Sequence, residues 1–234
     1  MDLALEVFDV LSEKRLSREL PFRKNDIIRI IENSILEKIP IKLVGFWGVG
    51  NKNKSNWADL KCCEFLKKMQ QLVEKIYPTG LNFTFVISVE HGIHNGISKD
   101  KITSYTKNIE LLLEKFSFNF VYLEKYWKKY GITFEKVDKI LESKQKDWWN
   151  VVENKEKMEK AAEARNFRLR KKGAQGYFIF RNLEKEFLEK EFRDSIFFTF
   201  TSSEWKNVLP DTPTLYLYSL GRKQSEAPWF ITKD

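Results

Sequence analysis

The sequence predicts an α/β protein whose mostly parallel sheet is flanked by helices. Two apolar runs, residues 41–47 (IKLVGFW) and 83–89 (FTFVISV), are typical of strands that are covered on both faces of a parallel sheet. A third run, residues 118–123 (FNFVYL), follows them. A segment with helical periodicity separates each run from the next, and this alternation indicates parallel strands joined by right-handed crossovers.

Residues 1–38 are expected to form two N-terminal helices before the first strand. Pro21 separates them, and Pro40 ends the second. The second carries an apolar face of isoleucines at helical spacing: Ile27, Ile28, Ile31 and Ile35. Residues 1–15 are acidic and amphipathic and lack a long apolar run, so we expect no signal peptide, no membrane contact and a cytoplasmic location.

Two amphipathic helices are predicted between the three strands. Asn56 followed by Asp59 is typical of a helix start, because such side chains satisfy the free backbone N–H groups of the first turn. Apolar stripes then predict the faces that pack on the sheet: Cys62, Leu66, Met69, Val73 and Ile76 in the first helix, and Ile102, Tyr105, Ile109, Leu112 and Phe116 in the second.

The second half of the chain divides into a charged segment and a strand-rich segment. Residues 134–172 contain neither Gly nor Pro and are dense in Lys and Glu, which predicts one or two long helices. Residues 173–234 contain further strand-like runs (GYFIF, SIFFTFT, TLYLYSL and WFITK), which we expect to extend the first sheet as antiparallel strands. The whole chain, 1–234, is therefore expected to form a single domain around a 41–123 core.

The composition indicates a globular protein, and it restricts the chemistry of the partners. With 42% hydrophobic and 32% charged residues, the chain can bury a full core. The net charge of +8 and the basic cluster 165–172 are compatible with nucleic acid, but we favour a lysine-rich composition and a solvated helix end as their explanation. Cys62 and Cys63 are adjacent, which excludes an ordinary disulfide and gives no metal-binding spacing.

The segment that follows the first strand has the character of a site for a small anion. Its glycines follow the pattern G-x-x-G-x-G, which matches neither a P-loop nor the dinucleotide fingerprint and is similar to the first loop of methyltransferases that use S-adenosylmethionine. Gly48 and Gly50 let the backbone approach a ligand closely. Lys52 and Lys54 supply positive charge, with Ser55 and Asn56 beside them. The alternative is a tight turn with exposed lysines.

Residues 90–96 (EHGIHNG) are expected to form a loop after the second strand, at the edge of the sheet where ligands bind in α/β folds. Both histidines of the chain, His91 and His94, lie here with Glu90 and Asn95, and such groups can transfer protons. A metal site and ordinary hydrogen bonding within the loop are the alternatives. The order His-Gly-Ile-His also resembles the class I aminoacyl-tRNA synthetase signature, with the glycine at a different place.

A third candidate for a functional site combines the predicted strand at 195–200 with the tail Ala227-Pro228-Trp229-Phe230. Together the segments resemble the pyoverdine/dityrosine biosynthesis family, the isocyanide (isonitrile) synthases. Lys54-Ser55-Asn56 stands where that family has Lys-Ser-Pro-Asn, and Glu90 stands for the acid after the second strand. The late strand and the Pro-Trp element correspond to Ile-Arg-Leu-Ser-Ile-His and Thr-Pro-Trp-His. This chain departs from them at Phe197, Thr201 and Phe230.

The resemblance implies a Rossmann-like enzyme of specialised metabolism that joins the amine of an amino acid to a carbon from a pentulose phosphate. It implies small-molecule partners and neither a metal nor another cofactor. Glu90, His91 and Lys54 are the expected catalytic residues. The expected substrate-binding residues are Gly48, Gly50, Lys52, Ser55, Asn56, His94, Asn95 and Trp229.

Two other functions remain open from the residues. The glycine pattern with Glu90 after the second strand favours a methyltransferase that uses S-adenosylmethionine, although Glu90 lies farther along than the ~20 residues usual for a ribose-binding acid. The positive charge favours a transferase with a class I-like fold that binds RNA or tRNA.

Overall fold

The computed structural model describes most of the first 133 residues and two later segments, and all structural statements below concern these residues. Of His91 and His94 it describes the backbone. The described residues are 2–14, 16–17, 19–48, 54–94, 96–133, 136, 139, 183–200 and 211–217. Almost all of the predicted charged helices at 134–172, and the predicted strands at 176–180 and 229–233, lie outside this part of the chain.

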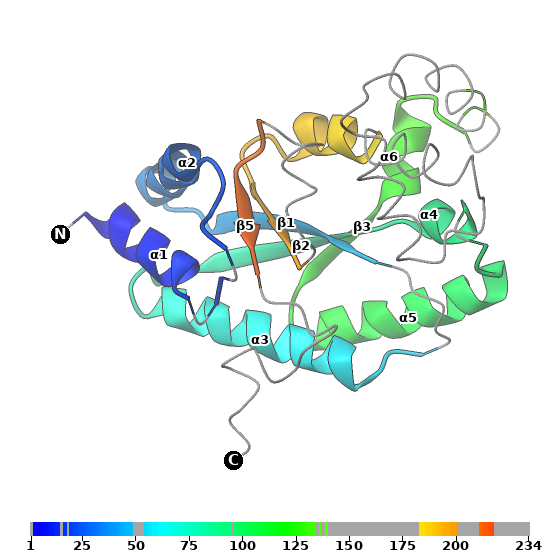
Figure 1. Cartoon of the computed structure of the whole chain (residues 1–234), viewed down its shortest axis with the longest axis horizontal. Helices are drawn as coiled ribbons and strands as arrows, with labels where there is room; N and C mark the ends of the chain where they lie inside the picture. The colour runs from blue at the N-terminus through cyan, green and yellow to red at the C-terminus, as the bar shows by residue number, and fades with distance from the viewer. Residues whose placement is uncertain are drawn as a thin grey trace.

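A five-stranded parallel sheet forms the centre of the structure (Figure 1). Its strand order is β3-β2-β1-β4-β5. This order confirms the predicted α/β class and the Rossmann-like arrangement. The strands are β1 (Ile41–Trp47), β2 (Leu81–Ile87), β3 (Asn119–Tyr122), β4 (Ile196–Thr199) and β5 (Thr214–Tyr216).

The expectation of antiparallel strands in the C-terminal part is wrong for β4 and β5. Both are parallel to β1, and β4 pairs directly with it. For β4 the physical reason is the helix at residues 183–191, which precedes this strand and returns the chain to the end of the sheet where β1 begins. Most of the connection from β4 to β5 lies outside the described residues. Antiparallel pairing among the described residues is seen in two isolated bridges, Ser17–Leu217 and Phe22–Thr214, which tie the N-terminal segment to β5.

Helices cover both faces of the sheet. Leu43 and its neighbours face a large cluster formed with α1 (Leu3–Ser12), α2 (Lys24–Glu37), α3 (Trp57–Glu74) and α5 (Lys99–Lys115). Val44 faces the opposite way, toward α6 (Leu123–Lys129) and helix 183–191. Successive strand residues point to opposite faces, so a central strand buried on both faces reads as a continuous apolar run. None of the helices among the described residues is both long and apolar enough to cross a membrane.

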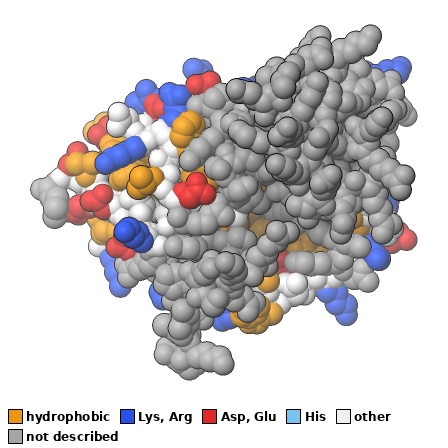
Figure 2. Space-filling model, viewed as in Figure 1, with side chains coloured by type: hydrophobic (Ala, Val, Ile, Leu, Met, Phe, Trp, Pro, Cys, Tyr) orange, Lys and Arg blue, Asp and Glu red, His pale blue; other side chains and the backbone are white. Residues whose placement is uncertain are grey.

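The predicted apolar stripes are the buried faces of their helices. Leu66, Met69 and Val73 of α3 and Ile102 and Ile109 of α5 are nearly inaccessible to solvent. On the face shown in Figure 2, the described acidic and basic side chains over α1 and α2 are interspersed with apolar ones. The net charge of the chain is therefore not gathered into a patch on this part of the surface.

Gly45 allows β1 and the ring of Phe198 in β4 to pack in close contact. A Cβ atom at position 45 would lie 2.6 Å from Cζ of Phe198, far inside van der Waals contact. The ring of Phe198 in turn meets Phe83 and Phe85 edge-on, with centroids 5.6 and 5.5 Å away. The first glycine of the G-x-x-G-x-G pattern is therefore explained by core packing rather than by approach of a ligand.

Candidate functional site

The carboxyl edge of the sheet is the place where the fold positions a ligand site. The register aligns Trp47 with Ile87 and Ile87 with Tyr122, so β1, β2 and β3 end on one line. The strand order reverses between β1 and β4, and ligands of open α/β sheets bind beyond the carboxyl ends of strands at such a switch point. The segments that follow Trp47, Ile87 and Tyr122 are therefore the first place to look for functional side chains.

Beyond β1, the described part of the predicted anion segment is open to solvent. Gly48 is exposed, and a Cβ atom built on it would meet nothing within 4 Å. Lys54 is exposed as well, and it forms no ion pair with a described residue, whereas Ser55 is half-buried. Gly50 and Lys52 lie outside the described residues. Binding of an anion by this segment stays a prediction.

The start of α3 is a capping box, as Asn56 and Asp59 predicted. The backbone N–H of Asp59 donates to Oδ1 of Asn56 at 3.1 Å, and the backbone N–H of Asn56 donates to Oδ2 of Asp59 at 2.8 Å. The carbonyl oxygen of the Asn56 side chain is thus engaged in capping. Its amide nitrogen is the atom that remains for the predicted contact with substrate.

A buried hydrogen-bond chain connects the capping box to the end of β1. The Tyr105 hydroxyl of α5 donates to Oδ1 of Asp59 at 3.0 Å and accepts from the Trp47 indole N–H at 3.1 Å. Burial raises the pKa of Tyr105, so its hydroxyl stays a donor. The sequence placed Tyr105 in an apolar stripe, and no local spacing indicates its polar partners.

Beyond β2, the expected loop is a short helix, α4 (Val89–His94). Gly92 and Gly96 are residues typical of a loop. The helix forms because a carboxylate from another part of the chain accepts a hydrogen bond from a backbone N–H of its first turn. Glu90 is half-buried, and its Oε2 atom is enclosed. His91 and His94 belong to α4, and their side chains, like all of Asn95, lie outside the described part. Their catalytic and binding roles, and the metal alternative, stay predictions.

The distant carboxylate belongs to Glu124, the second residue of α6, just beyond β3. Its Oε1 atom accepts from the backbone N–H of Glu90 at 2.8 Å and from the hydroxyl of Ser88 at 3.2 Å. Burial raises the pKa of Glu124, against the opposing effect of these hydrogen bonds and of backbone N–H groups. Sequence reasoning missed Glu124, although an acid directly after the apolar run 118–123 was the available signal.

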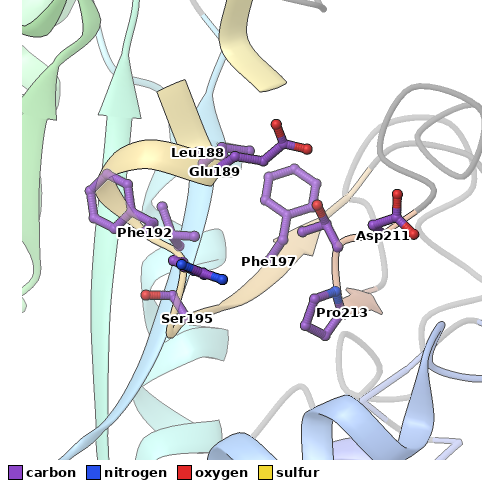
Figure 3. Close-up of a pocket in the computed structure, with 10 residues that line it drawn as sticks. Leu188, Glu189, Phe192, Ser195, Phe197, Asp211 and Pro213 are labelled. Atoms are coloured by element: carbon purple, nitrogen blue, oxygen red, sulfur yellow. The ribbon is translucent and has the colours of Figure 1, made fainter. Parts of the chain in front are cut away.

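A cavity of about 300 Å³ lies at the other edge of the sheet, where β4 and β5 begin (Figure 3). Val44, Phe192 and Phe197 contribute apolar walls, and the carboxylates of Glu189 and Asp211 lie at its rim. Asp211 is paired with Arg23 at 3.0 Å and Glu189 with Lys185 at 3.7 Å. This cavity is not between Lys54 and Glu90. Convergence of those two residues on one pocket stays a prediction, and so does the contact expected from Trp229, which lies outside the described residues.

No group of three or more His, Cys, Asp or Glu side chains within the described segments is placed to hold a metal ion. Cys62 and Cys63 are both free thiols on α3. Among the described residues beyond β2 and β3, the structure has two carboxyls, those of Glu90 and Glu124. The hydroxyl of Ser88 lies beside them and donates to Glu124. Such groups bind ammonium or hydroxyl groups and transfer protons.

Comparison with known proteins finds a solved structure with a similar fold. No family model matches the sequence, and no curated protein matches it. Among solved structures, the crystal structure of PvcA from Pseudomonas aeruginosa is similar, with a TM-score of 0.64 and 12% sequence identity. The match covers 93% of this chain and 84% of PvcA. The chain therefore has the fold of PvcA, and this fold agrees with the Rossmann-like fold that the sequence resemblance implies.

Proposed function

We propose that this protein is an isonitrile synthase-like enzyme, which converts the amine of an amino acid into an isocyanide with a pentulose phosphate as carbon donor, in specialised metabolism. The observation that carries the proposal is the likeness of fold to PvcA over 93% of the chain. The resemblance of the glycine–lysine segment and of Glu90 to the motifs of the family supports it independently. The carboxyls at the carboxyl edge supply chemistry that the first step requires.

The first step of such a reaction is imine formation between the amine and the sugar carbonyl. The ammonium gives one proton to a base, the amine nitrogen bonds to the carbonyl carbon as the C=O π bond breaks, and a proton passes from this nitrogen to the new alkoxide. The carbinolamine hydroxyl then gains a proton and leaves as water, and the nitrogen remains as a protonated imine. A carboxyl or imidazole that takes the first proton and returns it serves both stages. We assign this role to Glu90 and His91. The phosphate of the donor is assigned to Lys52, Lys54 and the amides near Gly48 and Gly50, with Ser55 beside them.

The remaining predicted contacts concern the amino acid. We assign its side chain to Trp229, because an aromatic residue can stack on an indole or phenol ring. His94, Asn95 and the amide nitrogen of Asn56 are assigned to its polar groups. Tryptophan and tyrosine are therefore the first substrates to test.

Mass spectrometry of the reaction products tests the proposal. The protein is incubated with tryptophan or tyrosine and uniformly ¹³C-labelled ribulose 5-phosphate, and the isocyanide is sought together with its label. A labelled isocyanide is expected from at least one of the two amino acids. If none of the protein amino acids gives an isocyanide, the proposed reaction is wrong.

One observation favours a second candidate, a methyltransferase that uses S-adenosylmethionine. Glu90 follows β2, the neighbour of β1, and nucleotide-binding folds place a ribose-binding acid in this region. Calorimetric titration with S-adenosylmethionine separates the candidates. Binding heat supports the methyltransferase, and its absence at millimolar concentrations rejects it.

A further inference from the structure

We propose that Glu124 recognises the ammonium group of the amino-acid substrate through its Oε2 atom. This inference rests on the proposed function, since it assigns the amine subsite of the same enzyme. No role was predicted for Glu124 from the sequence. Three features of this residue support the assignment: the fixed orientation of its carboxylate, the unused oxygen, and the uncompensated charge.

The carboxylate of Glu124 is held in one orientation by Oε1. That oxygen accepts from the backbone N–H of Glu90 at 2.8 Å and from the hydroxyl of Ser88 at 3.2 Å, and Ser88 itself is 5% exposed. Both donors come from the segment that leaves β2, whereas Glu124 leaves β3. Because two strands fix the group, the direction in which Oε2 points is set before any ligand binds.

The second oxygen is enclosed and unused. Oε2 of Glu124 is shielded from solvent and has no hydrogen-bond partner among the residues that the structure describes. A buried polar atom without a partner destabilises the folded state, and more so when it is charged, so its presence calls for an explanation. The capping of α4 uses Oε1 alone, so it does not explain why Oε2 is buried without a partner among the described residues.

The negative charge of Glu124 is also uncompensated within the described part of the chain. No Lys or Arg side chain there forms an ion pair with it. The neighbouring hydroxyl, that of Tyr122 in β3, donates to Glu110 instead. Burial without a cation raises the pKa of Glu124, and an ammonium at Oε2 would lower it again.

A primary ammonium suits this oxygen better than other cationic groups. Its charge is compact and it carries three donors, whereas a guanidinium is wide and planar and needs two aligned acceptors. Since Oε2 is shielded, the side chains above it must move aside for the ligand, and a small head group requires the least movement. Exclusion of water then strengthens the charge-assisted hydrogen bond.

The test compares amino acids with the same molecules lacking the amine. The pairs are L-tryptophan with 3-indolepropionate and L-tyrosine with 3-(4-hydroxyphenyl)propionate, titrated by calorimetry against the full-length wild-type protein. The wild type is expected to bind at least one amino acid about tenfold or more tightly than its partner without the amine. This comparison needs no variant, so it holds even if a variant fails to fold.

Glu124→Gln is the decisive variant. Its amide oxygen can still accept from Ser88 and Glu90, but the charge and the free acceptor are lost. It should bind the amino acid about tenfold more weakly and leave the affinity for the deaminated partner unchanged. Glu110→Gln, which alters a neighbouring carboxyl on α5 that is bonded to Tyr122, is the matched control and should change neither affinity.

Three results would overturn the inference: unchanged amino-acid binding in Glu124→Gln, equal binding of the two members of each pair, or no binding of tryptophan and tyrosine by the wild type. The isocyanide assay separates this failure from that of the proposed function. Equal product from wild type and Glu124→Gln contradicts the inference alone. Amine-dependent binding that Glu124→Gln removes, without any isocyanide, contradicts the reaction alone.

Discussion

The carboxyl of Glu124 should make the free energy of unfolding decrease as pH rises, whereas a salt-bridged acid makes it increase. Burial raises its pKa in the folded state, so the folded protein holds the proton more tightly than the unfolded chain. The free energy of unfolding therefore falls as pH rises from the unfolded pKa through the folded one.

Glu124→Gln removes this titration. Its melting temperature relative to wild type should be higher at about pH 7.5 than at about pH 4, as measured by circular dichroism at both values. If the melting temperature of Glu124→Gln relative to wild type is instead lower at about pH 7.5 than at about pH 4, the folded state stabilises the ionised form of Glu124.

Tyr105 should contribute to stability through its hydroxyl. Tyr105→Phe removes the donor to Asp59 and the acceptor for the Trp47 indole, both of them buried. We expect a loss of roughly 1–3 kcal/mol in urea unfolding. Tyr126→Phe is the control, because that ring packs against Phe187 while its hydroxyl forms no hydrogen bond with the described residues, and it should cost little. Equal losses in the two variants would contradict the role of the network.

Lys54 should matter for activity and not for folding. It is exposed and unpaired among the described residues, so Lys54→Ala should leave the melting temperature almost unchanged. If it binds the donor phosphate, the KM for ribulose 5-phosphate should rise about tenfold or more. Lys42→Ala, at the amino end of β1, is the control and should affect neither quantity. A large drop in melting temperature for Lys54→Ala would mark a structural residue.

Individual contacts could be predicted from the sequence where they are local. Asn56 and Asp59 are three residues apart, and their capping box was predicted. The bonds from Tyr105 to Asp59 and from Glu90 to Glu124 span 46 and 34 residues. No spacing rule reaches across such distances, because the partners meet only after the sheet has formed.

Among the elements, the buried strands were predicted well and the direction of the later ones was not. The bounds of β1 coincide with its apolar run, since Pro40 precedes it and Gly48 follows. The runs at β4 and β5 were found as well. The direction of β4 depends on the crossover helix at 183–191, which carries no signal of orientation in its own residues. Likewise, α4 depends on a cap that Glu124 supplies from another element.

The contact between β1 and β4 gives a test at the scale of elements. Gly45→Ala should destabilise the protein by roughly 1–3 kcal/mol, because the new methyl group collides with the ring of Phe198. Urea unfolding measures the loss, and Phe198→Leu in the same chain should recover part of it. Gly48→Ala, which has open space around its Cβ, should leave stability unchanged. Additive losses in the double variant would contradict the predicted collision.

At the scale of the molecule, the sheet has two edges with different chemistry. The carboxyl edge brings together the segments after β1, β2 and β3, with Glu90, Ser88 and Glu124. The opposite edge holds the cavity between Phe192, Phe197 and Pro213. The rule of the topological switch favours the carboxyl edge as the place of the ligand site.

A crystal structure of the protein soaked with tryptophan and inorganic phosphate tests this assignment most directly. We expect ligand density beyond the carboxyl ends of β1, β2 and β3, with the amine of tryptophan within hydrogen-bond distance of Glu124. Density in the cavity lined by Phe197 and Pro213, with none at the carboxyl edge, would contradict it.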